Sequence, residues 1–145
     1  MTDRPAILDS DTLSELSRGS PKVVTRARAY LVRHGRFTIT SVTVFERLRG
    51  YHAAIRDGKP YELQLRDFER LAAACLVLPF DVAAADVAAR IWAALGARGR
   101  RALGDILIAA IASARGLPLV TRNRRDFQPI ARLDFVDLAL LDWTR

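Results

Sequence analysis

The sequence predicts an α/β protein with a central parallel sheet of four to five strands and helices on both faces. Two observations support this fold class. Short apolar stretches alternate along the 145 residues with longer segments of helical periodicity. The first stretch, Ala6–Leu8, is continuously apolar, as is typical of parallel strands buried on both sides. No repeat, linker or low-complexity segment interrupts the pattern, so residues 1–145 are expected to form one domain.

The first half of the chain is expected to contain two strands and four helices. Ser20 followed by Pro21 is typical of an N-cap and a first helical residue, and Gly35 ends that helix. Ser41 or Thr43 is expected to cap the helix after the second strand. The elements are a strand at 6–8, helices at 12–17 and 21–34, a strand at 37–40, a helix ending near 57 and a helix at 61–74. The last helix has an apolar stripe of Leu63, Leu65, Phe68, Leu71 and Ala72.

The second half continues the alternation. Asp81 is expected to cap a long helix, and Gly116 to end the helix before the fourth strand. The expected elements are a strand at 76–80, helices at 82–97 and 104–115, a strand at 118–121 and a possible fifth strand at 133–136.

The charge of the chain indicates an acidic partner. The net charge is +7, which makes nucleic acid the leading candidate. Arginine supplies 21 of the 23 basic residues and favours bidentate contacts with phosphate. A GC-rich genome would produce the same excess of arginine, so the net charge carries more weight than the choice of arginine.

Cysteine content and hydropathy predict a cytoplasmic protein. The single cysteine, Cys75, excludes an internal disulfide and suits a reducing compartment. No uncharged apolar run reaches the length of about 18 residues that a membrane span needs. The N-terminal MTDRPAILD contains no apolar core of a signal peptide. We therefore expect no membrane partner.

Acidic residues follow the first expected strand directly. In an open α/β sheet, the ligand-binding crevice lies outside the carboxyl ends of the strands. Asp9 is therefore expected to face this crevice, with Asp11 and Thr12 just behind it. Aspartate is also a favoured N-cap, so capping of the following helix is the alternative role of Asp9 or Asp11.

Three more carboxylates are expected near the same edge. Glu46 lies about one turn into the helix after the second strand, and Asp126 follows the fourth strand. A solvent-exposed helix face and an Asx turn are their structural alternatives. Asp105 lies in the first turn of a helix that is apolar on every side. Burying such a carboxylate is costly unless it is paired, protonated or bound to a cation, which favours a functional role for Asp105.

Four carboxylates in one crevice would repel each other. A hard divalent cation bound through oxygen relieves the repulsion, and Mg²⁺ or Mn²⁺ in such a site activates water for phosphoryl transfer. Two arginine-rich segments flank Asp105 and Asp126 and are expected to hold a polynucleotide backbone. These segments contain Arg98, Arg100, Arg101, Arg122, Arg124 and Arg125.

Four segments of the chain follow one another in the order and spacing of a known family. They are ILDSDTLSEL at 7–16, TSVTVFERLRGY at 40–51, LGDILIAAIASARGLPLVTRN at 103–123 and RDF at 125–127. With them, and with LPFD at 78–81, the chain resembles a PIN-domain ribonuclease of the VapC toxin type. The resemblance covers nearly the whole chain.

This resemblance implies a three-layer sandwich and a set of site residues. The implied acidic quartet is Asp9, Glu46, Asp105 and Asp126, supported by Thr121 and Asn123. Asp9 and Asp105 would bind Mg²⁺ or Mn²⁺, with the other two carboxylates binding directly or through water. The family also implies endoribonuclease activity on structured RNA such as tRNA, homodimerisation and inhibition by a cognate VapB-type antitoxin. Asp11 stands where the family usually has Asn or Ser, which leaves the number and affinity of metal ions open.

Two other functions are compatible with parts of the sequence. Asp9-Ser10-Asp11-Thr12 also fits the DxDxT motif of haloacid-dehalogenase-like phosphatases, with Asp9 as the nucleophile and Asp11 as a general acid. That chemistry needs a later lysine beside the phosphate, and no lysine follows Lys59. The third possibility is a non-catalytic PIN-like module that binds RNA or protein, although an intact set of carboxylates argues against it.

Overall fold

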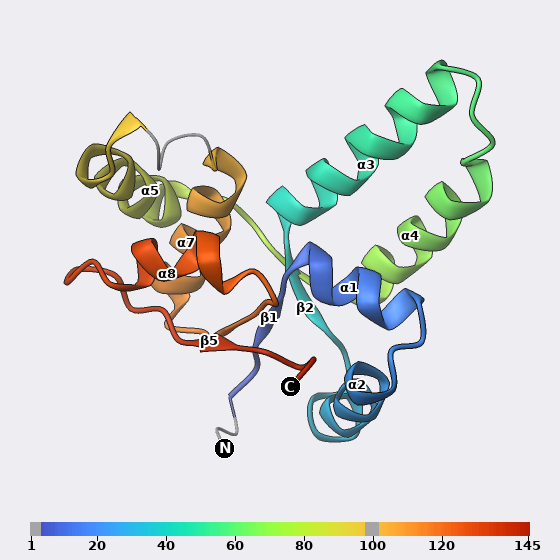
Figure 1. The fold of residues 1–145 in the computed structure, drawn as a ribbon, viewed down its shortest axis with the longest axis horizontal. Helices are drawn as coiled ribbons and strands as arrows, with labels where there is room; N and C mark the ends of the chain where they lie inside the picture. Colours follow the sequence, from blue (N-terminus) through green and yellow to red (C-terminus); the bar gives the residue numbers. More distant parts are fainter. Residues whose placement is uncertain (1–3, 98–101) are drawn as a thin grey trace.

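The computed structural model describes residues 4–97 and 102–145. In these ranges the strands form one parallel sheet in the order β3-β2-β1-β4-β5. Figure 1 shows β1 and β2 at the centre of the molecule, between the helices. The strands are β1 Ile7–Leu8, β2 Thr38–Thr40, β3 Leu76–Leu78, β4 Leu119–Val120 and β5 Leu140–Leu141. The predicted α/β class with a parallel sheet is confirmed.

The order of the strands reverses next to β1. From β1 the chain adds β2 and β3 on one side of the sheet and later places β4 and β5 on the other side. Ile7 pairs with Leu119, and Leu8 pairs with Val120. Such a reversal opens a crevice at the carboxyl edge of a parallel sheet. Asp9 and Thr121, the residues that follow β1 and β4, are therefore brought together at this edge.

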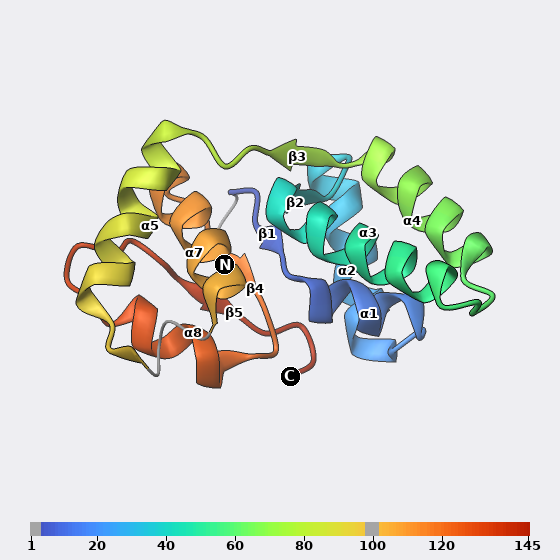
Figure 2. The same ribbon diagram turned by 90° about the horizontal axis from the view of Figure 1, so that it is seen from above.

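Helices cover both faces of the sheet. Figure 2 shows α5, α7 and α8 on one face and α1 to α4 on the other, with α3 and α4 forming a hairpin that extends beyond the sheet. The helices are α1 Ser10–Ser17, α2 Pro21–His34, α3 Ser41–Arg56, α4 Glu62–Ala74, α5 Val82–Ala94, α7 Leu103–Arg115 and α8 Arg124–Ala131. None of these helices in the described part of the chain is long and apolar enough to cross a membrane.

The side chains of the strands alternate between two cores. Ile7 and Leu119 pack with the helices of the α5, α7 and α8 layer. Their neighbours Leu8 and Val120 pack in the second core, under α1 and α2. All four side chains are fully buried, because each face of the sheet is covered by helices. This arrangement is the predicted three-layer sandwich.

The predicted fifth strand at 133–136 is wrong. This segment forms turns, in which the Leu133 amide donates to Ile130 O and the Val136 amide donates to Leu133 O, both at 3.1 Å. The fifth strand is β5, further along the chain. The unpredicted helix α8 explains the difference, because the chain must run back from its end before it can pair with β4. Pro129 lies inside α8, and a proline within a segment argues against a helix there when only the sequence is known.

Three predicted details of the helices also need correction. The N-cap of α3 is Thr40, whose Oγ1 accepts the Thr43 amide at 3.1 Å, and not Ser41 or Thr43. Leu63 does not belong to the buried stripe of α4, because 64% of it is exposed at the solvent end of the hairpin. Helix α5 ends at Ala94, earlier than the predicted residue 97.

Candidate active site

Asp9 lies at the carboxyl end of β1 and is buried, with 7% of its surface exposed. Its Oδ1 accepts the Ser10 amide at 2.8 Å, so Asp9 is the N-cap of α1. Its Oδ2 accepts the hydroxyl of Thr121 at 2.9 Å across the strand reversal. The sequence presented capping and a place in the crevice as alternatives, and the structure combines them in one carboxylate.

Asp11 ties α1 to the turn after β4. Its Oδ2 accepts the Arg122 amide at 3.1 Å and lies 3.3 Å from the Thr121 hydroxyl. Its Oδ1 lies 3.3 Å from the hydroxyl of Thr12. The Thr121 hydroxyl also accepts the Asn123 amide at 3.0 Å, which orients its proton toward the carboxylates. Asp11 thus supports the local structure of the crevice.

Glu46 reaches the crevice from α3 and approaches the start of α7. A Cβ added to Gly104 would lie 3.2 Å from the carboxyl carbon of Glu46 and closer still to Oε2. Only glycine leaves room for this approach. The side chain of Glu46 is half-buried and its carboxylate lies 4.0 Å from Arg49 Nη2. Glu46 therefore reaches the first turn of α7, which also carries Asp105.

The carboxyl group of Asp105 has a more strongly raised pKa than that of Asp9. Among the described residues it has no hydrogen-bond partner, and it is only partly exposed. Burial raises its pKa to about 7, and the neighbouring charges of Asp9, Asp126, Glu46 and Asp11 add to this effect. The structure therefore brings the predicted quartet into one electrostatic neighbourhood.

The pKa of Asp9 is also raised, to about 6. Burial is the main cause, followed by the charge of Asp11, while hydrogen bonds from Ser10 and Thr121 lower the pKa and the charge of Glu46 raises it. Two carboxyl groups of the crevice thus resist ionisation.

Asp126 occupies the exposed rim of the crevice. It lies in the first turn of α8, and its Oδ2 accepts the side-chain amide of Asn123 at 2.9 Å. This contact joins two side chains and is not the Asx turn considered for Asp126, in which a carboxylate accepts a backbone amide. The same carboxylate is close enough to Asp105 to raise its pKa. Asn123 links Asp126 to Thr121 and so to the end of β4.

The predicted RNA-binding arginines differ in their surroundings. Arg122 is exposed and pairs with Glu15 at 3.0 Å, and Arg125 is exposed. Arg124 points inward, where its Nη2 donates to Leu140 O at 3.3 Å and its Nε is buried without a partner. Arg98, Arg100 and Arg101 lie outside the described residues.

The donor groups fit a divalent cation in their chemistry. Carboxylate oxygens are the ligands that Mg²⁺ and Mn²⁺ prefer. Burial is the main cause of the raised pKa values of Asp9 and Asp105, and the charges of neighbouring carboxylates add to it. As positioned, however, no three His, Cys, Asp or Glu side chains within residues 4–97 and 102–145 could hold a metal ion. The residues therefore fit a divalent cation through the type and charge of their donor atoms, and not through the positions of these atoms in the structure.

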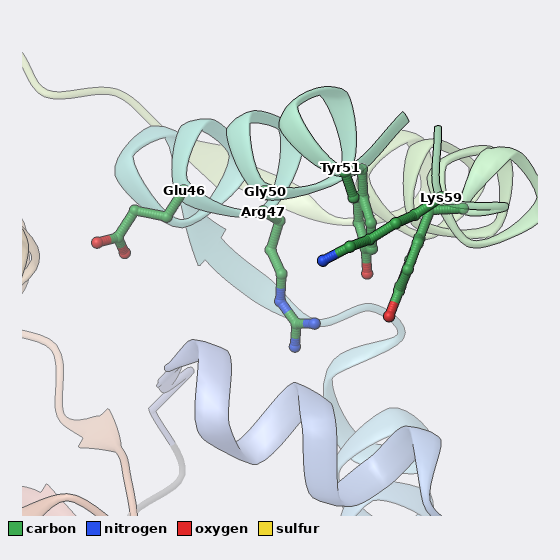
Figure 3. Close-up of a pocket in the computed structure, with 7 residues that line it drawn as sticks. Glu46, Arg47, Gly50, Tyr51 and Lys59 are labelled. Atoms are coloured by element: carbon green, nitrogen blue, oxygen red, sulfur yellow. The ribbon is translucent and has the colours of Figure 1, made fainter. Parts of the chain in front are cut away.

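Two grooves adjoin the site. A groove of about 300 Å³ opens beside Glu46 and is lined also by Arg47, Gly50, Tyr51, Ala54, Lys59 and Tyr61 (Figure 3). A second groove of about 550 Å³ separates α1 from the α3–α4 hairpin and shares Arg47, Tyr51 and Tyr61 with the first.

The sequence did not predict a role for either Arg47 or Gly104. The glycine directly before Asp105 was a usable signal, whereas nothing in the sequence distinguished Arg47 from the other arginines of its helix.

Comparisons with known proteins agree with the fold. The family model of the PIN domain matches residues 6–134. No curated protein gives a significant match. Among solved structures, the chain is similar to VapBC-1 from nontypeable Haemophilus influenzae, with 23% identity over 98% of this chain and 100% of that chain and a TM-score of 0.73.

Two further structures have the same fold. One is DNA-bound VapBC from Salmonella typhimurium, with 23% identity, coverage of 97% and 99% of the two chains and a TM-score of 0.72. The other is VapBC-5 from Mycobacterium tuberculosis, a member of the VapBC family of toxin-antitoxin systems, with 22% identity, coverage of 95% and 98% and a TM-score of 0.61. The family match spans most of the sequence and includes Asp9, Glu46, Asp105 and Asp126, and the chain therefore belongs to the PIN domain family.

Proposed function

We propose that the chain is the toxin of a toxin–antitoxin pair and acts as a Mg²⁺- or Mn²⁺-dependent endoribonuclease on structured RNA such as tRNA. Membership of the PIN domain family and the likeness to chains of VapBC structures support this function. The observation that carries the proposal is the crevice between β1 and β4. There the carboxyl group of Asp105, which has no hydrogen-bond partner among the described residues, lies near three other candidate carboxylates.

Each carboxylate has a distinct part in this proposal. Asp9 and Asp105 hold the cation, with Glu46 and Asp126 as further ligands, directly or through water. When bound, the cation supplies an activated water and offsets the charge that develops on the phosphate. Thr121 fixes the orientation of Asp9 through the hydrogen bond at 2.9 Å, which keeps one carboxylate oxygen in place.

The basic rim provides the substrate contacts in this proposal. Arg122 and Arg125 are exposed beside the crevice and would hold the RNA backbone on either side of the scissile phosphate. The sequence predicts further phosphate contacts from Arg98, Arg100 and Arg101, which lie outside the described residues. The net charge of +7 supports an RNA substrate, because phosphate contacts dominate affinity for nucleic acid.

The proposed partner is a VapB-type antitoxin that inhibits the nuclease. The similar chains come from VapBC structures, which supports such a partner. We further propose that the chain forms a homodimer, acts in the cytoplasm and folds as one domain over residues 1–145.

The test is cleavage of a structured RNA by the purified chain without antitoxin. Cleavage is expected with Mg²⁺ or Mn²⁺ and none with EDTA. The non-catalytic module predicts RNA binding without cleavage under either condition. The phosphatase alternative, which the family match does not support, predicts turnover of small phosphomonoesters and intact RNA. Intact RNA in the presence of both metals would overturn the proposed nuclease.

A further inference from the structure

Arg47 connects two elements that carry site residues. It lies on α3, directly after Glu46, and its Nη2 donates to Ser10 O and to Ser14 Oγ on α1, both at 2.8 Å. The Ser14 hydroxyl lies 3.2 Å from Ser10 O, which closes a triangle of hydrogen bonds. Ser10 in turn directly follows Asp9. One guanidinium therefore joins the neighbours of two candidate carboxylates.

The partners of Arg47 are unusual for a partly buried cation. Both are neutral oxygens, and no ion pair to Arg47 occurs within residues 4–97 and 102–145. Its Nε is buried without a hydrogen-bond partner, and the guanidinium lies 6.0 Å from the ring centre of Phe68 on α4. Desolvating a cation without a counterion is unfavourable. Among the described residues, the hydrogen bonds to α1 and the contact with the Phe68 ring are the interactions that offset this cost.

The two grooves show where the hydrogen bonds between Arg47 and α1 lie. Arg47 lines both the groove beside Glu46 and the larger groove between α1 and the α3–α4 hairpin. Figure 3 shows Glu46 and Arg47 leaving α3 in different directions, Arg47 toward α1. Because the larger groove separates the hairpin from α1, the hydrogen bonds of Arg47 hold the two together at the end nearest the crevice.

We propose that Arg47 is a positioning residue that sets the separation between the carboxylates of Asp9 and Glu46 by tying α3 to the first turn of α1. This inference rests on the proposed nuclease function. It assigns Arg47 a role in the geometry of metal binding and catalysis and none in RNA binding. A shift of about 1 Å in a reacting group can reduce the rate by roughly a hundredfold, so a backbone tie of this kind affects turnover strongly.

The test compares variants that weaken the tie with a matched loss of charge. Arg47→Met removes both hydrogen bonds and keeps an apolar stem, Arg47→Lys keeps the charge, and Ser14→Ala removes one acceptor. Arg56→Met is the control, because Arg56 is exposed at the end of the same helix. Mn²⁺ affinity is measured from the loss of the free-ion electron paramagnetic resonance signal, and kcat and KM are measured for RNA cleavage.

For Arg47→Met we expect kcat and Mn²⁺ affinity each to fall roughly tenfold or more, with KM for RNA changed less than about threefold. Arg47→Lys is expected to recover part of both losses. Ser14→Ala should have a smaller effect, which nearly disappears in the Arg47→Met background because both changes break the same tie. Arg56→Met should match the wild type in kcat and Mn²⁺ affinity.

Three results would overturn the inference. The first is an Arg47→Met protein with the kcat and Mn²⁺ affinity of the control. The second is a loss confined to KM, which would make Arg47 an RNA contact. The third result applies if Arg47→Met does not fold: the Mn²⁺ affinities of Arg47→Lys and of Ser14→Ala are then both the same as that of the wild type. Failure of the proposed function is distinct, because the wild type itself would then neither bind Mn²⁺ nor cleave RNA, and the role of Arg47 would fall with it.

Discussion

The carboxylate of Glu46 occupies the space that a side chain at Gly104 would fill. Gly104→Ala is therefore expected to push Glu46 out of the crevice. Alanine also favours a helix over glycine by roughly 0.5–1 kcal/mol, and Glu46 is flexible enough to move. The variant should therefore be at least as stable as the wild type but cleave RNA roughly tenfold or more slowly. Thermal unfolding and cleavage rates measure the two effects.

Gly50→Ala is the control for this prediction. Gly50 lies on α3, and a Cβ there would meet nothing within 4 Å. Gly50→Ala should gain helix stability without losing cleavage. Equal cleavage rates for Gly104→Ala and Gly50→Ala would show that the position of Glu46 does not matter for the reaction.

The substitution Asp105→Asn tests whether the reaction requires the negative charge of this side chain or only its shape. Asparagine is nearly isosteric with aspartate but neutral, so the variant should lose RNA cleavage by orders of magnitude and keep its fold. Without metal it should be no less stable than the wild type, because one of several repelling charges is removed. If Asp105 only stabilises the first turn of α7, asparagine would replace it with little change in cleavage.

The stability of the metal-free protein is expected to fall as the pH rises from about 4 to about 7. The pKa values of Asp9 and Asp105 are raised from 3.8 to about 6 and about 7 in the folded state. The folded state therefore binds these protons more tightly than the unfolded state, and the resulting stabilisation is lost as both groups ionise. Urea unfolding in EDTA at several pH values measures it.

The contribution of Asp105 to this pH dependence can be isolated. Subtracting the unfolding free energies of Asp105→Asn from those of the wild type removes the titration of most other groups. The difference should favour the wild type progressively less toward pH 7. A difference that does not vary with pH would contradict the raised pKa of Asp105.

Mg²⁺ or Mn²⁺ is expected to raise the melting temperature. A ligand that binds only the folded state stabilises it, by about 2.7 kcal/mol at a concentration of one hundred times Kd. Asp9→Asn should weaken this shift because it removes a candidate ligand. Identical melting temperatures in EDTA and in millimolar Mn²⁺ would argue strongly against a metal site between Asp9 and Asp105.

Arg125 and Arg124 are expected to differ in their effect on RNA binding. Arg125 is exposed, whereas Arg124 donates to Leu140 O inside the protein. Arg125→Ala should weaken RNA binding and reduce the slope of log affinity against log salt by about 1, as the loss of one phosphate contact does. Arg124→Ala should mainly reduce the melting temperature. An unchanged slope for Arg125→Ala would exclude a phosphate contact there.

The parts of the site that the sequence predicted depend on local signals. A continuous apolar stretch followed by Asp9 predicts a strand end at the crevice. The apolar surroundings of Asp105 predict a carboxylate whose burial is costly unless it is compensated. Both residues lie where they were expected. Their predicted roles as metal ligands still await the experiments above.

The missed features depend on contacts between distant elements. The choice of β5 over the segment at 133–136 was decided by where the chain returns after α8, which hydropathy does not encode. The approach of Glu46 to Gly104 and the tie from Arg47 to α1 depend on the angle at which the α3–α4 hairpin leaves the sheet. No pattern along a single element specifies that angle.

The hydrogen bond between Thr121 and Asp9 joins residues 112 positions apart in the sequence. Strand β1, at the centre of the sheet, gains its neighbour β4 only after all the residues between the two strands have been synthesised. During translation β1 therefore leaves the ribosome long before β4, the strand at the other side of the crevice, has been synthesised. Since such long-range pairing also closes slowly, an unfinished polypeptide has no assembled acidic centre.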